Sequence, residues 1–291
     1  MLHQLLDIKK GIDEHPLIVG HIIKKGGVWR RFLTWQLIKP LSKSGRVVSW
    51  INDSKLKIYP GRASGTGCYY YGLMEYESMA FLYRYLNEND VFFDIGANVG
   101  VYTVLARNAR KIVAFEPAKD TIGILKENVI LNNMKNVTIE EYGVSDTKGR
   151  CFFSKNLDTT NHILDQREAN VDCVEVNTVS LDGYCREKII QPSVIKIDAE
   201  GGEEMIIRGA SEILSNKDLN VIIMENFGNM ALFEVMKAKG FGVYYYHPIS
   251  NRVLEEAMTG GDNNCIFIRD IEVVKKQLQR KRRILCKRMD L

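Results

Sequence analysis

An acidic residue followed by a glycine-rich turn is the part of this sequence best suited to bind a ligand. The apolar residues Val91 to Phe93 end at Asp94, and the chain continues as IGANVG, with glycines at Gly96 and Gly100. This order predicts a strand, a tight turn and a helix start, where backbone N–H groups lack partners and glycine permits close approach. Because Asp94 would repel a pyrophosphate and attract an ammonium or sulfonium, the turn indicates a cationic ligand.

A second carboxylate, Glu116, lies 22 residues after Asp94, where the second strand is expected to end. In nucleotide-binding α/β sheets, a carboxylate at this place accepts hydrogen bonds from the ribose hydroxyls. A ribose joined to a positively charged amino acid describes S-adenosylmethionine, which we therefore expect as the cofactor. A nicotinamide dinucleotide is disfavoured by Asp94 and by the missing third glycine.

The run KIDAEG places three ionisable residues, Lys196, Asp198 and Glu200, at alternating positions. On a strand, the two-residue period would put all three on one side. Methyl transfer to a hydroxyl requires alignment and a base, so Asp198 or Glu200 could accept the proton or bind the cofactor amine. Two alternatives stay open. Lys196 could form only a structural salt bridge with one of the acids. No metal is expected, but Asp198, Glu225 and Asn226 could instead bind magnesium.

Two histidines and one glutamate are further candidates. His162 and His247 could each accept the proton, because neutral imidazole is a base near neutral pH, although a surface or structural role fits each of them as well. His162 and Asn161 lie in a polar insertion, residues 154–170, which we expect to form a flap that contacts the acceptor. Glu75 precedes a predicted helix and could either cover the cofactor or cap that helix.

Strands and helices alternate along residues 75–268, which predicts a doubly wound, Rossmann-like α/β fold with helices on both faces. The sheet is expected to hold seven mostly parallel strands and to end in a C-terminal antiparallel hairpin. The expected strands are 91–94, 112–115, 137–141, 194–197, 221–224, 244–246 and 265–268, with a further β-rich run at 171–176. The expected helices are 75–86, 100–108, 119–131, 203–214 and 230–238.

The ends of the chain differ from the middle in charge. Residues 1–70 hold 12 Lys/Arg and 4 Asp/Glu, and residues 270–291 hold 8 and 3, so the basic residues gather at the two ends of a chain of net charge +4. We expect an N-terminal appendage (1–70) with a hairpin at 46–60 and a loop at 61–67, a main domain (71–270) and a basic C-terminal helix (271–291). The apolar residues between 22 and 38 indicate an amphipathic helix that lies on a membrane or packs on the main domain.

Composition favours a cytoplasmic protein, with contact at the inner membrane face as an alternative. The six cysteines have no metal-ligand spacing and are expected to be reduced thiols. No apolar run approaches the roughly 20 residues that span a bilayer, and the N-terminus lacks the apolar core of a signal peptide. Nucleic acid is not an expected partner, because the central part is acidic and no interleaved aromatic and basic patch is present. The oligomeric state stays open.

Five segments, in order, carry a family resemblance: FFDIGANVGVYTVLA, VAFEPAKDTIGILKENVILN, GVSDTKG, VNTVSLDGY and IKIDAEGGEEMIIRGA. With IIMEN after them, they make the chain from about Gly72 to Asp270 resemble the FkbM-type methyltransferases. This branch of the class I S-adenosylmethionine-dependent enzymes mostly O-methylates sugars and related natural products. The resemblance implies that residues 71–270 form a class I methyltransferase domain.

The resemblance also implies which residues bind the cofactor. Asp94, Gly96, Asn98 and Gly100 would line the methionine end, Glu116 would hold the ribose, and the run from Tyr142 and Gly143 to Ser145 would lie near the adenine. Glu75, Tyr102 and Pro117 are further candidates for contact with the cofactor. Relatives in the superfamily commonly use an acidic residue for the adenine amine, and here only Asp146 or Glu141 could serve.

The expected function is O-methylation of a sugar hydroxyl in a polysaccharide, a glycolipid or their precursor. N- or O-methylation of a nonsugar natural product shares every cofactor motif. A noncatalytic scaffold that docks a glycan-synthesis partner is the alternative from a different class.

Overall fold

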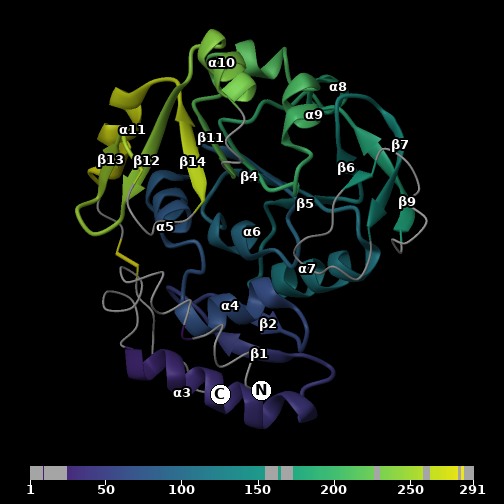
Figure 1. The fold of residues 1–291 in the computed structure, drawn as a ribbon, viewed down its shortest axis with the longest axis vertical. Helices are drawn as coiled ribbons and strands as arrows, with labels where there is room; N and C mark the ends of the chain where they lie inside the picture. Colours follow the sequence, from purple (N-terminus) through teal and green to yellow (C-terminus); the bar gives the residue numbers. More distant parts are fainter. Residues whose placement is uncertain are drawn as a thin grey trace.

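The protein is built on one large sheet that is antiparallel on one side and parallel on the other (Figure 1). The computed structural model describes residues 9, 25–154, 163–164, 173–225, 230–257, 263–280 and 283–284. The strand order is β13-β12-β14-β11-β10-β3-β4-β5, and the run from β11 to β5 is parallel. The strands are β3 (Val91–Ile95), β4 (Lys111–Phe115), β5 (Val137–Glu140), β10 (Val194–Ile197), β11 (Val221–Glu225), β12 (Gly242–His247), β13 (Arg252–Leu254) and β14 (Asn264–Ile268).

Helices cover both faces of this sheet, which confirms the doubly wound α/β fold. Alternate strand residues face opposite sides, so Phe92 and Val194 lie in one buried cluster and Phe93 and Ile195 in another. The first face is covered by α5 (Tyr76–Tyr85), α6 (Val101–Leu105), α7 (Lys119–Leu131) and α11 (Ile271–Leu278). The second is covered by α8 (Leu181–Lys188), α9 (Glu203–Arg208), the short η3 (Ile213–Ser215) and α10 (Met230–Ala238).

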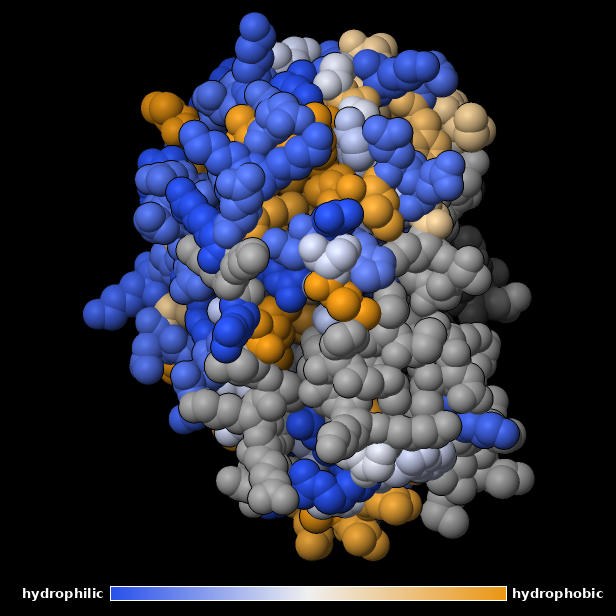
Figure 2. Space-filling model, turned by 90° about the vertical axis from the view of Figure 1, so that its left-hand side faces the viewer, coloured by the Kyte–Doolittle hydropathy of each residue, from blue (hydrophilic) through white to orange (hydrophobic). Residues whose placement is uncertain are grey.

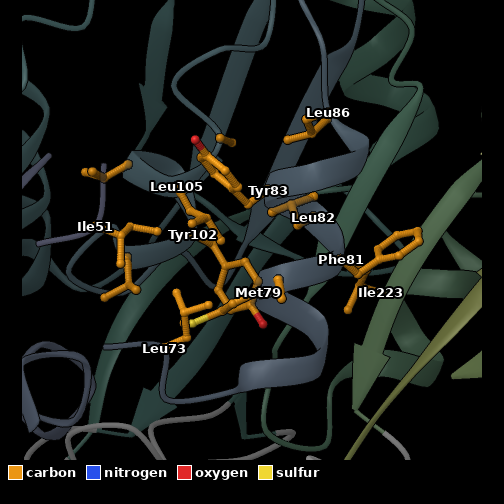
Figure 3. Packing of buried hydrophobic residues seen from close by; sticks show 14 of the residues in the cluster. Ile51, Leu73, Met79, Phe81, Leu82, Tyr83, Leu86, Tyr102, Leu105 and Ile223 are labelled. Atoms are coloured by element: carbon orange, nitrogen blue, oxygen red, sulfur yellow. The ribbon is translucent and has the colours of Figure 1, made fainter. Parts of the chain in front are cut away.

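The N-terminal part gathers at one end of the molecule (Figure 1). It comprises α3 (Lys25–Ile38), η1 (Lys39–Leu41), the hairpin β1 (Arg46–Ser49) and β2 (Lys55–Ile58), and α4 (Ala63–Tyr71). The predicted hairpin is confirmed, and Asn52 and Asp53 adopt the positive φ values of a tight hairpin turn. Its Ile51 is buried in one cluster with Leu73, Met79 of α5 and Tyr102 of α6 (Figure 3). The domain boundary at residues 70–71 stays a prediction.

Residues 61–67 were expected to form a loop, and this expectation is wrong from Ala63 onward because α4 begins there. Glycine disfavours a helix in isolation, but Gly67 packs where a side chain would clash. A Cβ on Gly67 would lie 2.3 Å from Met74 Sδ. Tertiary contact therefore overrides the local propensity.

Three further differences concern strands and helix ends. The main sheet has eight strands, one more than expected, because β13 pairs antiparallel with β12. A separate sheet of order β6-β9-β7-β8 is formed by β6 (Gly143–Val144), β7 (Gly149–Ser154), β8 (Ile163–Leu164) and β9 (Cys173–Val179). The helix expected at 203–214 ends at Arg208, with Gly209 as its C-cap residue. Gly209 packs so closely that a Cβ would lie 2.3 Å from the Ser145 carbonyl oxygen.

In the described ranges, no helix is long and apolar enough to cross a membrane.

Candidate functional site

Strand register gathers polar side chains at one edge of the sheet. Lys196 of β10 lies beside Asp94 of β3, and Glu225 of β11 lies beside Asn264 of β14. Lys196, Asp94 and Glu225 each follow a buried strand residue by two positions, and Asn264 precedes the buried Ile266 by two, so all four share that face. The parallel strands end at the same edge, and the antiparallel β14 begins there. Residues far apart in the sequence therefore converge at one place.

Lys196 is the centre of this group. Its side chain is only 2% exposed, and its ammonium donates to Asn264 Oδ1 at 3.1 Å and to the Ile197 carbonyl at 3.3 Å. Two carboxylates lie slightly farther away: Asp198 Oδ2 at 3.7 Å and Glu75 Oε2 at 3.9 Å. A buried ammonium is stable only when such partners compensate for the lost hydration. The charge of Lys196 is thus held in place by the surrounding oxygen atoms.

Glu75 connects this group to α6. Its Oε2 accepts from the Tyr102 hydroxyl at 2.6 Å and from Asn264 Nδ2 at 2.8 Å. Asn264 therefore bridges Glu75 and Lys196, and the Tyr102 ring lies with its centre 5.2 Å from the Lys196 ammonium. Glu75 stands at the start of α5, but its side chain makes no capping hydrogen bond there. Of the two roles considered for Glu75, helix capping is thus not the one its carboxylate adopts.

The glycine-rich turn holds two buried carboxylates. Asp94 is 1% exposed and accepts from the Thr103 hydroxyl at 2.5 Å. Glu116 accepts from the backbone N–H groups of Asn98 and Ala118, both at 2.9 Å, and so ties the end of β4 to the turn. Burial raises the pKa of Asp94 to about 7, against the opposing effects of the Thr103 hydrogen bond and of the Lys196 charge. Burial likewise raises the pKa of Glu116 to about 7.

Gly96 is required by the contact between this turn and β10. Its φ is +76°, and a Cβ there would lie 1.9 Å from the carbonyl oxygen of Asp198. We expect Gly96→Ala to lower the free energy of unfolding by more than about 2 kcal/mol. The alanine would be strained at this positive φ, and the backbone at Asp198 would also have to move. Denaturant unfolding measures this free energy. Gly123→Ala in α7 is the matched control, since nothing lies within 4 Å, and it should stabilise by about 0.5–1 kcal/mol. Equal effects of the two changes would contradict the packing argument.

The three residues of the KIDAEG run do not form one row. Strand β10 ends at Ile197, and Glu200 has a left-handed φ of +48°, so the strand period does not reach Glu200. Asp198 is 34% exposed beside the buried Lys196. Glu225, considered above only as a magnesium ligand, belongs to the same group: burial, and then the nearby Asp198, raise its pKa. Asp198 is thus the accessible acid next to the ammonium.

The residues expected near the ribose and adenine lie along the ends of β4 and β5. Pro117 is half-buried directly after Glu116, Tyr142 packs at the margin of the second core cluster, and Gly143 pairs with Thr178 in the small sheet. Glu141 turns toward Lys126 and forms an ion pair at 2.9 Å, with both side chains half-exposed. Asp146 accepts from the hydroxyls of its neighbours Ser145 and Thr147. Glu141, considered above for the adenine amine, is thus paired with a surface lysine.

His247 has a local structural contact: its Nδ1 accepts from the Ser250 N–H at 3.1 Å in the turn between β12 and β13. His162, Asn161 and Asn226 lie outside the described residues. Within the part of the chain that the structure describes, no group of three His, Cys, Asp or Glu side chains could hold a metal ion. The cysteines of that part, Cys68, Cys151, Cys173, Cys185 and Cys265, are free thiols.

Comparison with known proteins identifies this architecture. The methyltransferase FkbM domain matches residues 94–247, from the end of β3 to the end of β12 and thus over more than half of the chain. The chain belongs to the FkbM methyltransferase family. The family match begins at Asp94 and includes the glycine turn, Glu116 and the KIDAEG run, which confirms the resemblance read from the sequence.

Individual relatives of this FkbM chain are distant. The hexuronic acid methyltransferase AglP of Haloferax volcanii is 26% identical over 153 residues, which cover 52% of this chain and 62% of AglP. Among solved structures, the methyltransferase FkbM of Methylobacillus flagellatus KT is 15% identical with a TM-score of 0.41, over 64% of this chain and 47% of that one. An rRNA methylase of Streptococcus thermophilus is 16% identical with a TM-score of 0.40, over 66% and 93%. The chain thus spans less than two thirds of the length of AglP.

Proposed function

We propose that this FkbM-family protein transfers a methyl group from S-adenosylmethionine to a hydroxyl of a sugar in a polysaccharide, a glycolipid or their precursor. The observation that carries the proposal is the pairing of Asp94 and Glu116. Both carboxylates are buried beside one glycine turn, at the ends of adjacent strands. The group around Lys196 and Asp198 lies at the end of the next strand, β10.

The donor chemistry of S-adenosylmethionine fits these carboxylates. Burial raises the pKa of each to about 7, and a donor or a positive charge from a bound ligand would favour the ionised form. Ribose hydroxyls can donate to the second lone pairs of the Glu116 oxygens, which already hold the turn through Asn98 and Ala118. An ammonium or sulfonium would stabilise the ionised form of Asp94. A phosphate would be repelled by the negative charge of both carboxylates.

The neighbouring strand end is suited to the proton transfer. When bound, S-adenosylmethionine supplies the methyl group on a sulfonium centre. The Asp198 carboxylate, partly exposed, would accept the proton of the acceptor hydroxyl, while the buried Lys196 orients it from behind at 3.7 Å. Glu75 and Asn264 would fix Lys196 through their mutual hydrogen bond. Glu200 remains a candidate for binding the cofactor amine or for the base itself.

The sugar acceptor is supported by AglP, whose name states that it methylates a hexuronic acid. A nonsugar acceptor would use the same cofactor site. Release of S-adenosylhomocysteine, measured with a panel of neutral sugars, uronic acid glycosides and nonsugar phenols, distinguishes these acceptors. A scaffold without activity would show no turnover with any of them. Turnover with sugars only supports the proposal. Turnover with phenols only would replace the acceptor class, and no turnover with any acceptor would favour the scaffold.

Titration calorimetry with S-adenosylhomocysteine tests the cofactor site directly. Measured at pH 8, above the pKa of about 7, Glu116→Ala should weaken binding at least about tenfold, or roughly 1.4 kcal/mol, because the ribose acceptor is lost. Glu204→Ala is the control, since Glu204 is an exposed acid paired with Arg208. Thermal unfolding checks that both variants are folded. An unchanged affinity in a folded Glu116→Ala protein would remove Glu116 from the ribose site.

A further inference from the structure

Helix α3 presents apolar side chains on two sides. One side carries Val28, Phe32 and Trp35, which are at most 3% exposed and pack on α4. The Phe32 ring lies 5.7 Å from that of Tyr70, and Arg31 donates to the Tyr69 carbonyl at 3.2 Å. Part of the apolar stripe expected in the sequence therefore packs on the protein.

The other side carries a row of exposed leucines. Leu33, Leu37 and Leu41 are 53%, 78% and 88% exposed, and they follow one another at intervals of four residues through α3 and η1. Leu33 and Leu37 share one face of α3, because residues four apart on an α-helix lie on the same face, and Leu41 follows as the last residue of η1. We call these three exposed side chains the leucine row. Other large exposed apolar residues, such as Ile130 in α7 and Met230 in α10, lie in separate elements. Exposed apolar side chains that are contiguous indicate a contact surface.

The charge around the leucine row has one sign. Residues 25–52 contain six Lys/Arg and no Asp/Glu. Arg30 and Lys43 are exposed at the two ends of the row, and Lys39 lies between Leu37 and Leu41. Figure 2 shows apolar atoms next to strongly hydrophilic ones at the lower end of the molecule, where α3 lies in Figure 1. A protein partner could match the apolar row alone, but the uniform positive charge around it favours an anionic partner.

We propose that α3 and η1 dock this protein on an anionic lipid bilayer. The leucine row would enter the boundary between headgroups and acyl chains, and Arg30, Lys39 and Lys43 would contact the anionic headgroups. The geometry also relates the bilayer to the proposed cofactor turn. Helix α4, on which α3 packs, carries Ser64, whose hydroxyl donates to Asn98 Oδ1 at 3.4 Å. The docked surface is therefore one helix away from the glycine turn, which suits an acceptor attached to a lipid.

Flotation of the full chain with vesicles tests docking without any methyl transfer. We expect binding to vesicles of 70% phosphatidylcholine and 30% phosphatidylglycerol, and at least tenfold weaker binding to pure phosphatidylcholine. The triple change Leu33→Gln, Leu37→Gln and Leu41→Gln should weaken binding to the anionic vesicles at least tenfold. Its matched control replaces exposed apolar residues elsewhere and should bind like the wild type: Ile130→Gln, Met230→Gln and Val235→Gln.

Charge is tested separately. Arg30→Gln and Lys43→Gln should each weaken binding to the anionic vesicles about fivefold, and higher salt should reduce the difference. Affinity for S-adenosylhomocysteine should be unchanged in all these variants, so that failure of docking is distinguishable from failure of the proposed function. Equal binding to both vesicle types, or no binding to either, would overturn the proposal. A wild-type dimer that the leucine changes convert to a monomer, without vesicle binding, would instead assign the row to contact between copies.

Discussion

Asp198→Asn should lower kcat about 10²- to 10⁴-fold and leave the Kd for S-adenosylhomocysteine within about threefold. The amide keeps the shape of the side chain but cannot accept the acceptor proton, and general base catalysis contributes that factor. The carboxylate of Asp198 is placed for this role because it is 34% exposed at the end of β10, while Lys196 behind it is buried. Single-turnover kinetics with an accepted sugar separate the chemical step from product release.

Glu200→Gln distinguishes the two acids that the sequence leaves equivalent. Glu200 stands in a left-handed turn after the strand, so its loss should lower kcat less than about tenfold. Glu204→Gln, an exposed change in α9, should alter neither kcat nor Kd. A large loss of kcat in Glu200→Gln with near-normal kcat in Asp198→Asn would reverse the assignment. Weakened binding of S-adenosylhomocysteine in Asp198→Asn would instead place Asp198 on the cofactor amine.

Part of the site could be predicted from the sequence because it depends on local order and one topological rule. Asp94 ends one strand and Glu116 follows the next, and parallel neighbours end at the same edge of a sheet. Their places at the ends of two successive strands therefore predicted that they lie close together in space. Lys196 on β10 follows in the same way, since β10 pairs with β3 in parallel.

Other parts depend on contacts that no local pattern encodes. Asn264 reaches Lys196 only because the antiparallel β14 lies between β11 and β12, an order that hydrophobic spacing does not specify. Its alternation with Ile266 and Ile268 was a usable signal for the face on which it lies. Glu75 meets Tyr102 through the packing of α5 on α6. Glu200 was placed wrongly because an extended pattern does not show where a strand ends.

Lys196→Met should lower the free energy of unfolding by about 3–5 kcal/mol, as is usual when one partner of a buried ionic group is removed. Methionine keeps most of the volume, so the loss reports the charge and its hydrogen bond to Asn264 rather than a cavity. The control is Lys57→Met, which removes a partly exposed lysine that pairs with Glu127 at 2.9 Å and should cost less than about 1 kcal/mol. Denaturant unfolding measures both.

The same experiment shows whether Glu75 and Lys196 act as a unit. Without the ammonium, the Glu75 carboxylate is a poorly compensated charge at the start of α5, so Glu75→Gln should recover part of the loss in the Lys196→Met protein. In the wild-type background, Glu75→Gln should destabilise, because an amide accepts less strongly from Tyr102 and Asn264. Additive effects of the two changes would show that the 3.9 Å separation carries no coupling. A coupling above about 1 kcal/mol would show that Glu75 and Lys196 stabilise the fold as a unit.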